Sequence, residues 1–139
     1  MSDGFGGTLG PLDVKLAHSI LYLLSLTAIA EGRDLEVSEH QLCRGLSKLE
    51  KTLHEDLGIP IRFDGVPPNR LCSPNVSQAV SLIVPFDIDA GWEYGIGNIL
   101  YYSQARAKLR VDRLAENFNY LDRCLLMNSL DDFRAGIRE

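Results

Sequence analysis

The sequence predicts a mainly α, single-domain helical bundle of about five helices, with an irregular N-terminal arm at residues 1–10. Three observations predict this class. An apolar run at residues 16–30 is typical of a central helix, because it is apolar on nearly all sides. A leucine stripe at residues 42–57 and a heptad-like pattern at residues 107–125 indicate two amphipathic helices. The chain of 139 residues, 45% of them apolar, is long enough to bury one core without a dividing linker.

The first predicted helix begins near Pro11, which suits the first helical turn because its missing N–H has no helical partner there. It continues through the apolar run and ends at Glu31-Gly32. A signal peptide is the alternative, but Asp3 and Asp13 precede the run where a signal peptide carries positive charge. The run is also shorter than the roughly 20 residues of a membrane span. We therefore predict a buried core helix and no membrane contact.

The second predicted helix has a clear start and stop. Ser38 and Gln41 form a capping-box pattern, in which each side chain accepts from a backbone N–H near the helix start. Gly58 suits the helix end. Between them lies one apolar stripe, at Leu42, Leu46, Leu49, Leu53 and Leu57. This spacing predicts one continuous helix with a buried face.

A short irregular β-ribbon is predicted near residues 59–71. Ile59, Ile61 and Phe63 alternate with period two, and Asp64-Gly65 is a turn pair. Pro67-Pro68 lacks the N–H groups that a fully paired returning strand needs. We therefore expect a ribbon and no larger sheet.

Three further helices are expected. Ser73-Pro74 begins one that ends before Pro85, and another is predicted over Trp92–Ala105. The last is a long helix whose apolar seam is Ala107, Val111, Leu114, Phe118, Leu121 and Leu125. Because the apolar surface extends beyond this seam, we predict a homodimer through residues 107–125.

Composition narrows the classes of partner and the compartment. The net charge of −5 disfavours a protein that coats nucleic acid without sequence preference, since such proteins carry a basic excess. The three cysteines, Cys43, Cys72 and Cys124, include no CxxC pair. An odd number of scattered cysteines predicts reduced thiols and a cytoplasmic protein.

Residues 35–71 resemble the winged helix-turn-helix of LysR-type transcription regulators. The likeness rests on Leu35, Val37 and Ser38, on the leucines that follow, and on Leu57-Gly58-Ile59-Pro60. The chain departs from the family at Glu39-His40, where that family has Gln-Pro, and in one extra helical turn before Leu57. The resemblance implies DNA contacts by His40, Gln41, Arg44, Lys48, Arg62 and Arg70.

Two clusters later in the chain are candidate protein-binding sites. The first is aromatic, and tyrosine and tryptophan are favoured anchors at protein interfaces; it comprises Trp92, Tyr94, Tyr101 and Tyr102. The second is basic, offset locally by Asp112 alone, and comprises Arg106, Lys108, Arg110 and Arg113. We predict a partner-binding surface there, with a solvated helix face as the alternative for the cations.

Signatures of catalysis, metals and cofactors are missing. The sequence has no G-x-S-x-G elbow, and Gly95-Ile96-Gly97 lacks the third glycine of a dinucleotide fingerprint. His40 and Cys43 lack the second close pair of ligands that a zinc site needs. We therefore predict no enzyme and no cofactor, but a regulatory interaction protein, either an adaptor or a small protein inhibitor. A winged-helix DNA-binding regulator is the alternative.

Overall fold

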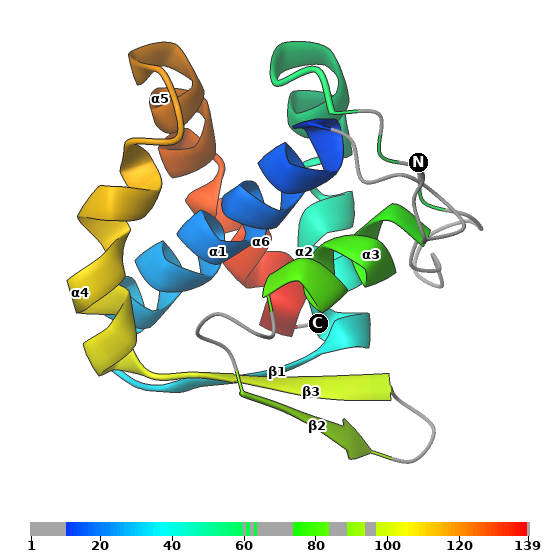
Figure 1. Cartoon of the computed structure of the whole chain (residues 1–139), viewed down its shortest axis with the longest axis vertical. Coiled ribbons are helices and arrows are strands. Elements are labelled where there is room, and N and C mark those ends of the chain that lie inside the picture. Colours follow the sequence, from blue (N-terminus) through cyan, green and yellow to red (C-terminus); the bar gives the residue numbers. More distant parts are fainter. Residues whose placement is uncertain are drawn as a thin grey trace, which may run out of the picture.

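The computed structural model describes residues 11–59, 61, 63, 74–83, 89–93 and 97–138. The predicted N-terminal arm, Arg62, Arg70, Cys72 and Tyr94 lie outside these residues. The helices and strands are α1 (Pro11–Glu31), β1 (Leu35–Ser38), α2 (Glu39–Ser47), the π-helical turn η1 (Thr52–Asp56), α3 (Pro74–Ile83), β2 (Asp89–Glu93), β3 (Gly97–Tyr102), α4 (Gln104–Ala115), α5 (Tyr120–Asn128) and α6 (Leu130–Arg138). The predicted mainly α class is confirmed (Figure 1).

Helix α1 runs through the middle of the molecule and contacts α3, α4, α5, α6 and β3 (Figure 1). Its buried apolar side chains surround the helix axis, since Leu16, Ile20, Leu23 and Leu24 are almost fully buried and Tyr22 is buried beside them. The window Val14–Glu31 has a mean hydropathy of 1.3, so by length and composition α1 could cross a membrane. In this structure 56% of that window is buried inside the fold, as the core-helix prediction requires.

The three buried hydroxyl groups of α1, those of Ser19, Ser25 and Thr27, have hydrogen-bond partners inside the core. The Ser19 hydroxyl donates to the Lys15 carbonyl at 2.8 Å, and the Thr27 hydroxyl donates to the Leu23 carbonyl at 2.7 Å. Ser25 is fully buried, and its Oγ lies 2.7 Å from the Tyr102 hydroxyl of β3. Since a buried hydroxyl without a partner costs about 1–3 kcal/mol, these bonds allow a helix with polar side chains to occupy the core.

A glycine ends α1 as the sequence predicts. Gly32 has a φ of +66°, in the left-handed region that suits a residue without Cβ. Its N–H donates to the Ile29 carbonyl, and the Arg33 N–H donates to the Ala28 carbonyl at 3.3 Å. This pair of bonds is the Schellman motif, which satisfies the last carbonyls of the helix and turns the chain into β1.

The predicted capping box of the second helix is confirmed. Gln41 N–H donates to Ser38 Oγ at 2.9 Å, and Ser38 N–H donates to Gln41 Oε1 at 2.9 Å. All five leucines of the predicted stripe are buried. The prediction of one continuous helix is wrong, because α2 ends at Ser47 and the chain re-forms a π-helical turn at Thr52–Asp56. Gly58, with a φ of +72°, ends this second segment.

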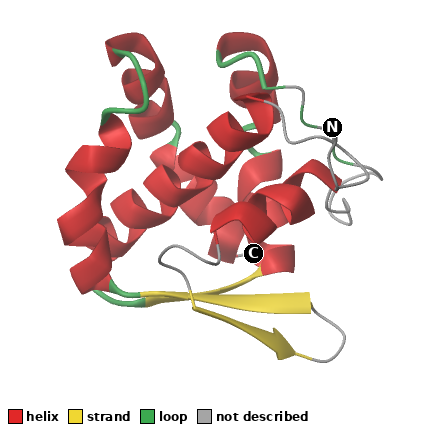
Figure 2. Ribbon diagram, in the orientation of Figure 1, coloured by secondary structure: helices red, strands yellow, loops and turns green. Residues whose placement is uncertain are grey.

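A three-stranded antiparallel sheet with the order β1-β3-β2 closes one end of the helical bundle (Figure 2). Leu35 pairs with Tyr102, and Gly91 pairs with Ile99. The predicted helix over Trp92–Ala105 is therefore wrong: this segment forms β2 and β3, and α4 begins only at Gln104. β3 is the central strand because it pairs with β1 on one side and with β2 on the other.

The predicted β-ribbon is not found where the structure describes residues 59–71. Ile59, Ile61 and Phe63 are buried but belong to no strand, and residues 64–71 lie outside the described part of the chain. The side chains that suggested a strand by alternation instead fill the core. A period-two pattern of apolar residues therefore does not distinguish a strand from an irregular segment that buries the same side chains.

The predicted long C-terminal helix is also wrong, since it is divided into α4 and α5. Asn117 Nδ2 donates to the Leu114 carbonyl at 3.2 Å, and Asn119 Oδ1 accepts from the Asp122 N–H at 2.8 Å. The first bond satisfies a carbonyl near the end of α4, and the second caps α5. Between them, Phe118 is buried with its ring 5.6 Å from that of Tyr22.

Helices α2 and α6 cross at glycines. A Cβ built on Gly136 would lie 2.6 Å from the Cα of Gly45 and 2.7 Å from the Arg44 carbonyl oxygen. A Cβ on Gly45 would lie 3.0 Å from a ring carbon of Phe133. No other residue fits at Gly136 without moving the α2 backbone, so the two helices are in backbone contact there.

Ion pairs fix both ends of α1. Glu31, whose side chain is only 10% exposed, accepts from Arg33 at 2.7 Å, Arg134 at 3.2 Å and Arg138 at 3.0 Å. Near the other end, Lys15 Nζ donates to the Leu57 carbonyl at 2.8 Å and lies 3.2 Å from Asp122. These contacts tie α1 to α6, to the end of η1 and to α5.

Candidate functional site

Helix α4 carries two features that bear on function, a pocket on its inner side and the exposed apolar residue Leu109 on its outer side. Its N-cap is Ser103, whose Oγ accepts from the Arg106 N–H at 3.1 Å. Ala107 is fully buried and Val111 and Leu114 pack against the core, so one face of α4 is fixed on the body of the molecule. The remaining faces hold cations and Leu109.

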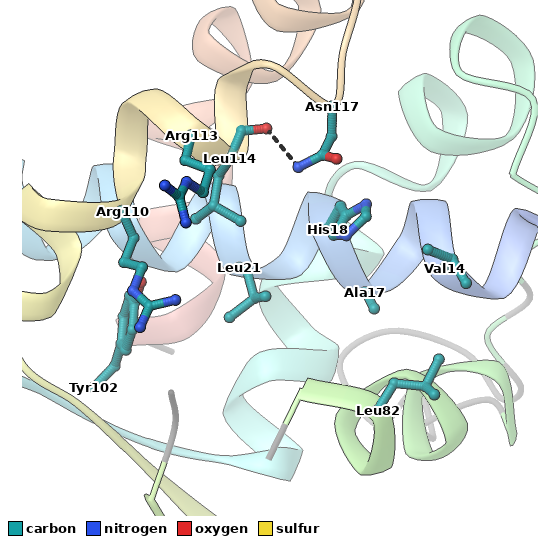
Figure 3. A pocket seen from close by; sticks show the side chains of 10 residues that line it. All are labelled: Val14, Ala17, His18, Leu21, Leu82, Tyr102, Arg110, Arg113, Leu114 and Asn117. Carbon is teal, nitrogen blue, oxygen red and sulfur yellow. Dashed lines mark hydrogen bonds between the residues drawn. The ribbon is translucent and has the colours of Figure 1, made fainter. Parts of the chain in front are cut away.

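The pocket lies where α1, α3 and α4 meet and has a volume of about 390 Å³ (Figure 3). Its walls are mostly apolar, with polar groups at Tyr102, at His18 and on α4. The lining side chains come from Val14, Ala17, His18, Leu21, Leu82, Tyr102, Arg110, Arg113, Leu114 and Asn117. This set holds two guanidinium groups and no carboxylate.

The polar side chains of the pocket differ in their charge and in whether they already have a hydrogen-bond partner. Tyr102 directs its hydroxyl to Ser25, and Asn117 uses its amide nitrogen on the Leu114 carbonyl (Figure 3). Burial lowers the pKa of His18 from its ordinary value of 6.5, so this imidazole is neutral at pH 7. The permanent positive charge at the pocket is therefore that of Arg110 and Arg113.

The predicted aromatic cluster is divided between the core and the surface. Tyr102 is 2% exposed and belongs to the core, whereas its neighbour Tyr101 on β3 is 42% exposed. Trp92 belongs to β2, where the structure describes only its backbone. Tyr101, Tyr102 and Arg106 line a second, open hollow beside β1. Of the predicted partner-binding residues, Arg110 and Arg113 lie instead at the pocket between the helices.

The predicted DNA-contacting residues of α2 do not share one open face. Gln41 donates its side-chain amide to the Ile137 carbonyl of α6 at 3.2 Å. Arg44 is partly buried, and its carbonyl lies at the glycine crossing. His40 and Lys48 are exposed.

The cysteines differ from the prediction. Cys43 is buried and disulfide-bonded, while Cys124 is a partly buried free thiol. The prediction that all three cysteines are reduced is therefore wrong for Cys43.

Within the described part of the chain, no group of three or more His, Cys, Asp or Glu side chains could hold a metal ion. His40 and Cys43, the pair considered from the sequence, have no further ligand near them among these residues.

Exposed apolar side chains lie on the outer surface of α4 and α5. Leu109 on α4 is 81% exposed, and Tyr120 and Leu121 at the start of α5 are 75% and 65% exposed. Met127, seven residues or about two helical turns after Tyr120, is 53% exposed. We call these four residues the outer apolar surface. Three of these four residues lie within residues 107–125, for which the sequence predicted an apolar surface wider than one seam. The chain forms two helices there, α4 and α5, in place of the predicted single helix.

No protein-family model matches the chain, and no curated protein or solved structure shows significant similarity to it. Sequence reasoning missed the pocket because its lining residues come from four separate elements. A signal was nonetheless present, since Arg110 and Arg113 sit three residues apart on a helix and thus on one side of it.

Proposed function

We propose that this chain is a non-enzymatic helical interaction protein, an adaptor or a small protein inhibitor, that binds a partner protein through its outer apolar surface. The exposure of Leu109, at 81%, carries the proposal together with that of Tyr120 and Leu121. Tyr120 and Leu121 are adjacent at the start of α5, and Leu109 lies on the preceding helix α4. Exposed apolar side chains that form one patch are typical of protein-binding surfaces. The sequence adds no catalytic motif that would favour an enzyme.

The charge of α4 indicates the chemistry of the partner. α4 carries Arg106, Lys108, Arg110 and Arg113 against one acidic residue, Asp112, although the whole chain has a net charge of −5. A partner with an apolar patch bordered by carboxylates would complement this helix in charge. A symmetric dimer that places α4 against α4 would instead bring like charges together. The proposed partner is therefore a different, acidic protein.

The test compares paired variants in quantitative affinity capture from the native host, followed by titration with the purified partner. Leu109→Asp combined with Leu121→Asp should abolish binding, because two carboxylates would enter an apolar contact. Tyr101→Asp, which alters an exposed aromatic residue on β3, is the matched control and should retain binding. Retained binding by the double variant would contradict the proposal.

Light scattering on the purified chain separates the partner from a second copy. A monomer is expected at micromolar concentration. A dimer that the Leu109→Asp/Leu121→Asp variant dissociates would replace the adaptor proposal by the homodimer predicted for residues 107–125.

A second candidate is winged-helix DNA binding, and the order of elements favours it. α2 and α3 precede the hairpin β2–β3, and β1 completes the sheet beside β3, which is the order of a winged helix. In this order α3, and not α2 as the sequence suggested, would take the recognition position. However, α3 (PNVSQAVSLI) contains no charged residue, and β2 carries Asp89 and Glu93. Neither element offers the cations that contact phosphates.

Fluorescence anisotropy with random duplex DNA at two salt concentrations tests this candidate. Binding that weakens steeply with salt would support it, because cations that contact phosphates release counterions. An unchanged signal at 50 mM salt with micromolar protein would remove it.

A further inference from the structure

We propose that the pocket between α1, α3 and α4 binds a small amphipathic monocarboxylate, with its apolar body against Ala17, Leu21 and Leu82 and its carboxylate at Arg113. This is a ligand site separate from the outer apolar surface, and it does not depend on the proposed function.

The size and lining of the pocket favour an apolar ligand body. Its volume of about 390 Å³ lies in the range of small-molecule sites, roughly 300–1,000 Å³. Val14, Ala17, Leu21, Leu82 and Leu114 give it mostly aliphatic walls. Water against such walls makes few hydrogen bonds, so an apolar group that displaces it gains affinity. The aliphatic walls thus favour a hydrocarbon chain over a polar metabolite.

The charge at the pocket favours an anionic ligand head. Arg110 and Arg113 both line it from α4, and none of the described residues that line it is an Asp or a Glu. Figure 3 shows both guanidinium groups on the α4 side of the pocket, opposite Leu82 on α3. A guanidinium presents parallel N–H donors that match the two oxygens of a carboxylate. The ligand would therefore lie with its charged end at α4 and its chain between α1 and α3.

Neutral groups complete the site without adding charge. His18, kept neutral by burial, has one ring N–H to donate, whereas the Asn117 amide nitrogen is already bonded to the Leu114 carbonyl. The Tyr102 hydroxyl is bonded to Ser25, so the tyrosine presents its ring. A single carboxylate thus finds its donors at Arg113, with His18 as a neutral neighbour.

The experiment is isothermal titration of the purified full chain with ligands below their micellar concentration. Octanoate and decanoate are the probes. Octanol, octylamine and octyl phosphate are the comparison ligands, because they have hydrocarbon chains of similar length and different head groups. We expect decanoate to bind with a Kd of about 0.1 mM or tighter. Octanol and octylamine should bind at least about tenfold more weakly, since they lack the charge that the arginines recognise.

Three variants locate the bound ligand. Arg113→Met should weaken decanoate binding at least about tenfold and leave octanol unchanged, because only the head contact is lost. Ala17→Leu fills part of the cavity and should weaken decanoate more than octanoate. Lys108→Met removes an exposed cation of the same helix that does not line the pocket, and it should bind as the unmodified chain does.

Several outcomes would overturn the proposal. These are no heat with either acid, equal binding of octylamine, and equal losses in Arg113→Met and Lys108→Met, which would indicate an unspecific charge effect. Tighter binding of octyl phosphate than of octanoate would assign the site to phosphate-headed lipids instead. Circular dichroism confirms that each variant is folded, and the His18 ring resonances should shift on decanoate binding if the ligand lies in this pocket.

Discussion

The crossing of α2 and α6 and the junction of α1, α3 and α4 are packed in opposite ways. At the first, Gly136 and Gly45 bring two backbones into contact, so that even a Cβ on Gly136 would lie 2.6 Å from its neighbour. At the second, a pocket of about 390 Å³ stays open. The same small domain thus contains a helix contact that tolerates no added atom and another that leaves room for a ligand.

Side-chain size explains this difference. Glycine has no side chain to separate two helices, and Phe133 and Ile137 close the space around Gly45. At the pocket, the side chains of Leu21, Leu82 and Arg110 line a space beside the small Ala17 that they leave unfilled. Interiors are normally close-packed, so an open apolar junction is the more informative of the two for function.

The largest expected effect is that of Gly136→Ala, which breaks the tight crossing. One methyl group would require the α2 backbone to move, because the atoms it meets are backbone atoms. We expect a loss of about 3 kcal/mol in the free energy of unfolding, at the upper end of overpacking effects. Urea denaturation measures it. Ala135→Ser on the exposed side of α6 is the control and should change stability by less than about 0.5 kcal/mol.

Glu31→Gln, which changes the carboxylate that joins α1 to α6, should have the next largest effect, about 2 kcal/mol at pH 7. Burial alone would raise the pKa of Glu31, but the hydrogen bond from Arg134 and the charges of Arg33 and Arg138 lower it below its ordinary 4.5. The stability from this lowered pKa is fully present above pH 4.5 and is lost as the pH falls through the folded-state value.

The stability difference between Glu31→Gln and the unmodified chain should therefore shrink as the pH falls below 4.5, which urea titrations at several pH values would measure. A difference that stays constant over that range would show that the arginines do not act through the charge of Glu31.

Tyr102→Phe should cost about 1–2 kcal/mol, because it leaves the fully buried Ser25 hydroxyl without its partner. Adding Ser25→Ala should recover part of this loss, since both polar groups are then absent. The double-mutant cycle in thermal unfolding measures the coupling. If the stability losses of the two single variants add up to the loss of the double variant, the 2.7 Å contact contributes nothing of its own.

The smallest effect is expected for Ala17→Leu, which adds three carbons where the pocket has room. Although Ala17 is 4% exposed, the enlarged side chain enters an open space, so stability should change by less than about 1 kcal/mol. Differential scanning calorimetry measures it. A loss as large as that of Gly136→Ala would show that the two junctions are packed alike.

Local signals predicted the elements that depend on nearby residues. The capping box at Ser38, the glycine stops and the central helix are confirmed, because each is fixed by hydrogen bonds or burial within a few turns. The strands β2 and β3 were predicted as a helix because β1, about sixty residues earlier in the sequence, is what pairs with β3. No local pattern contains that partner.

The break between α4 and α5 shows a different limit. The heptad spacing continues across it because Phe118 is buried in the turn as it would be in a helix. The capping side chains Asn117 and Asn119 were the available signal against a continuous helix. The sequence could place Arg110 and Arg113 on one side of a helix, but it could not predict the pocket as a whole, since its walls are assembled from α1, α3, β3 and α4.

The burial of α1 has a consequence for synthesis of the chain. Lys15 reaches Asp122, and α1 is covered by α4, α5 and α6, all of which are translated after it. At about 5–20 residues per second, the apolar helix would leave the ribosome roughly 5–20 s before its last covering helix. During that interval it presents the length and hydropathy of a membrane span to the cell.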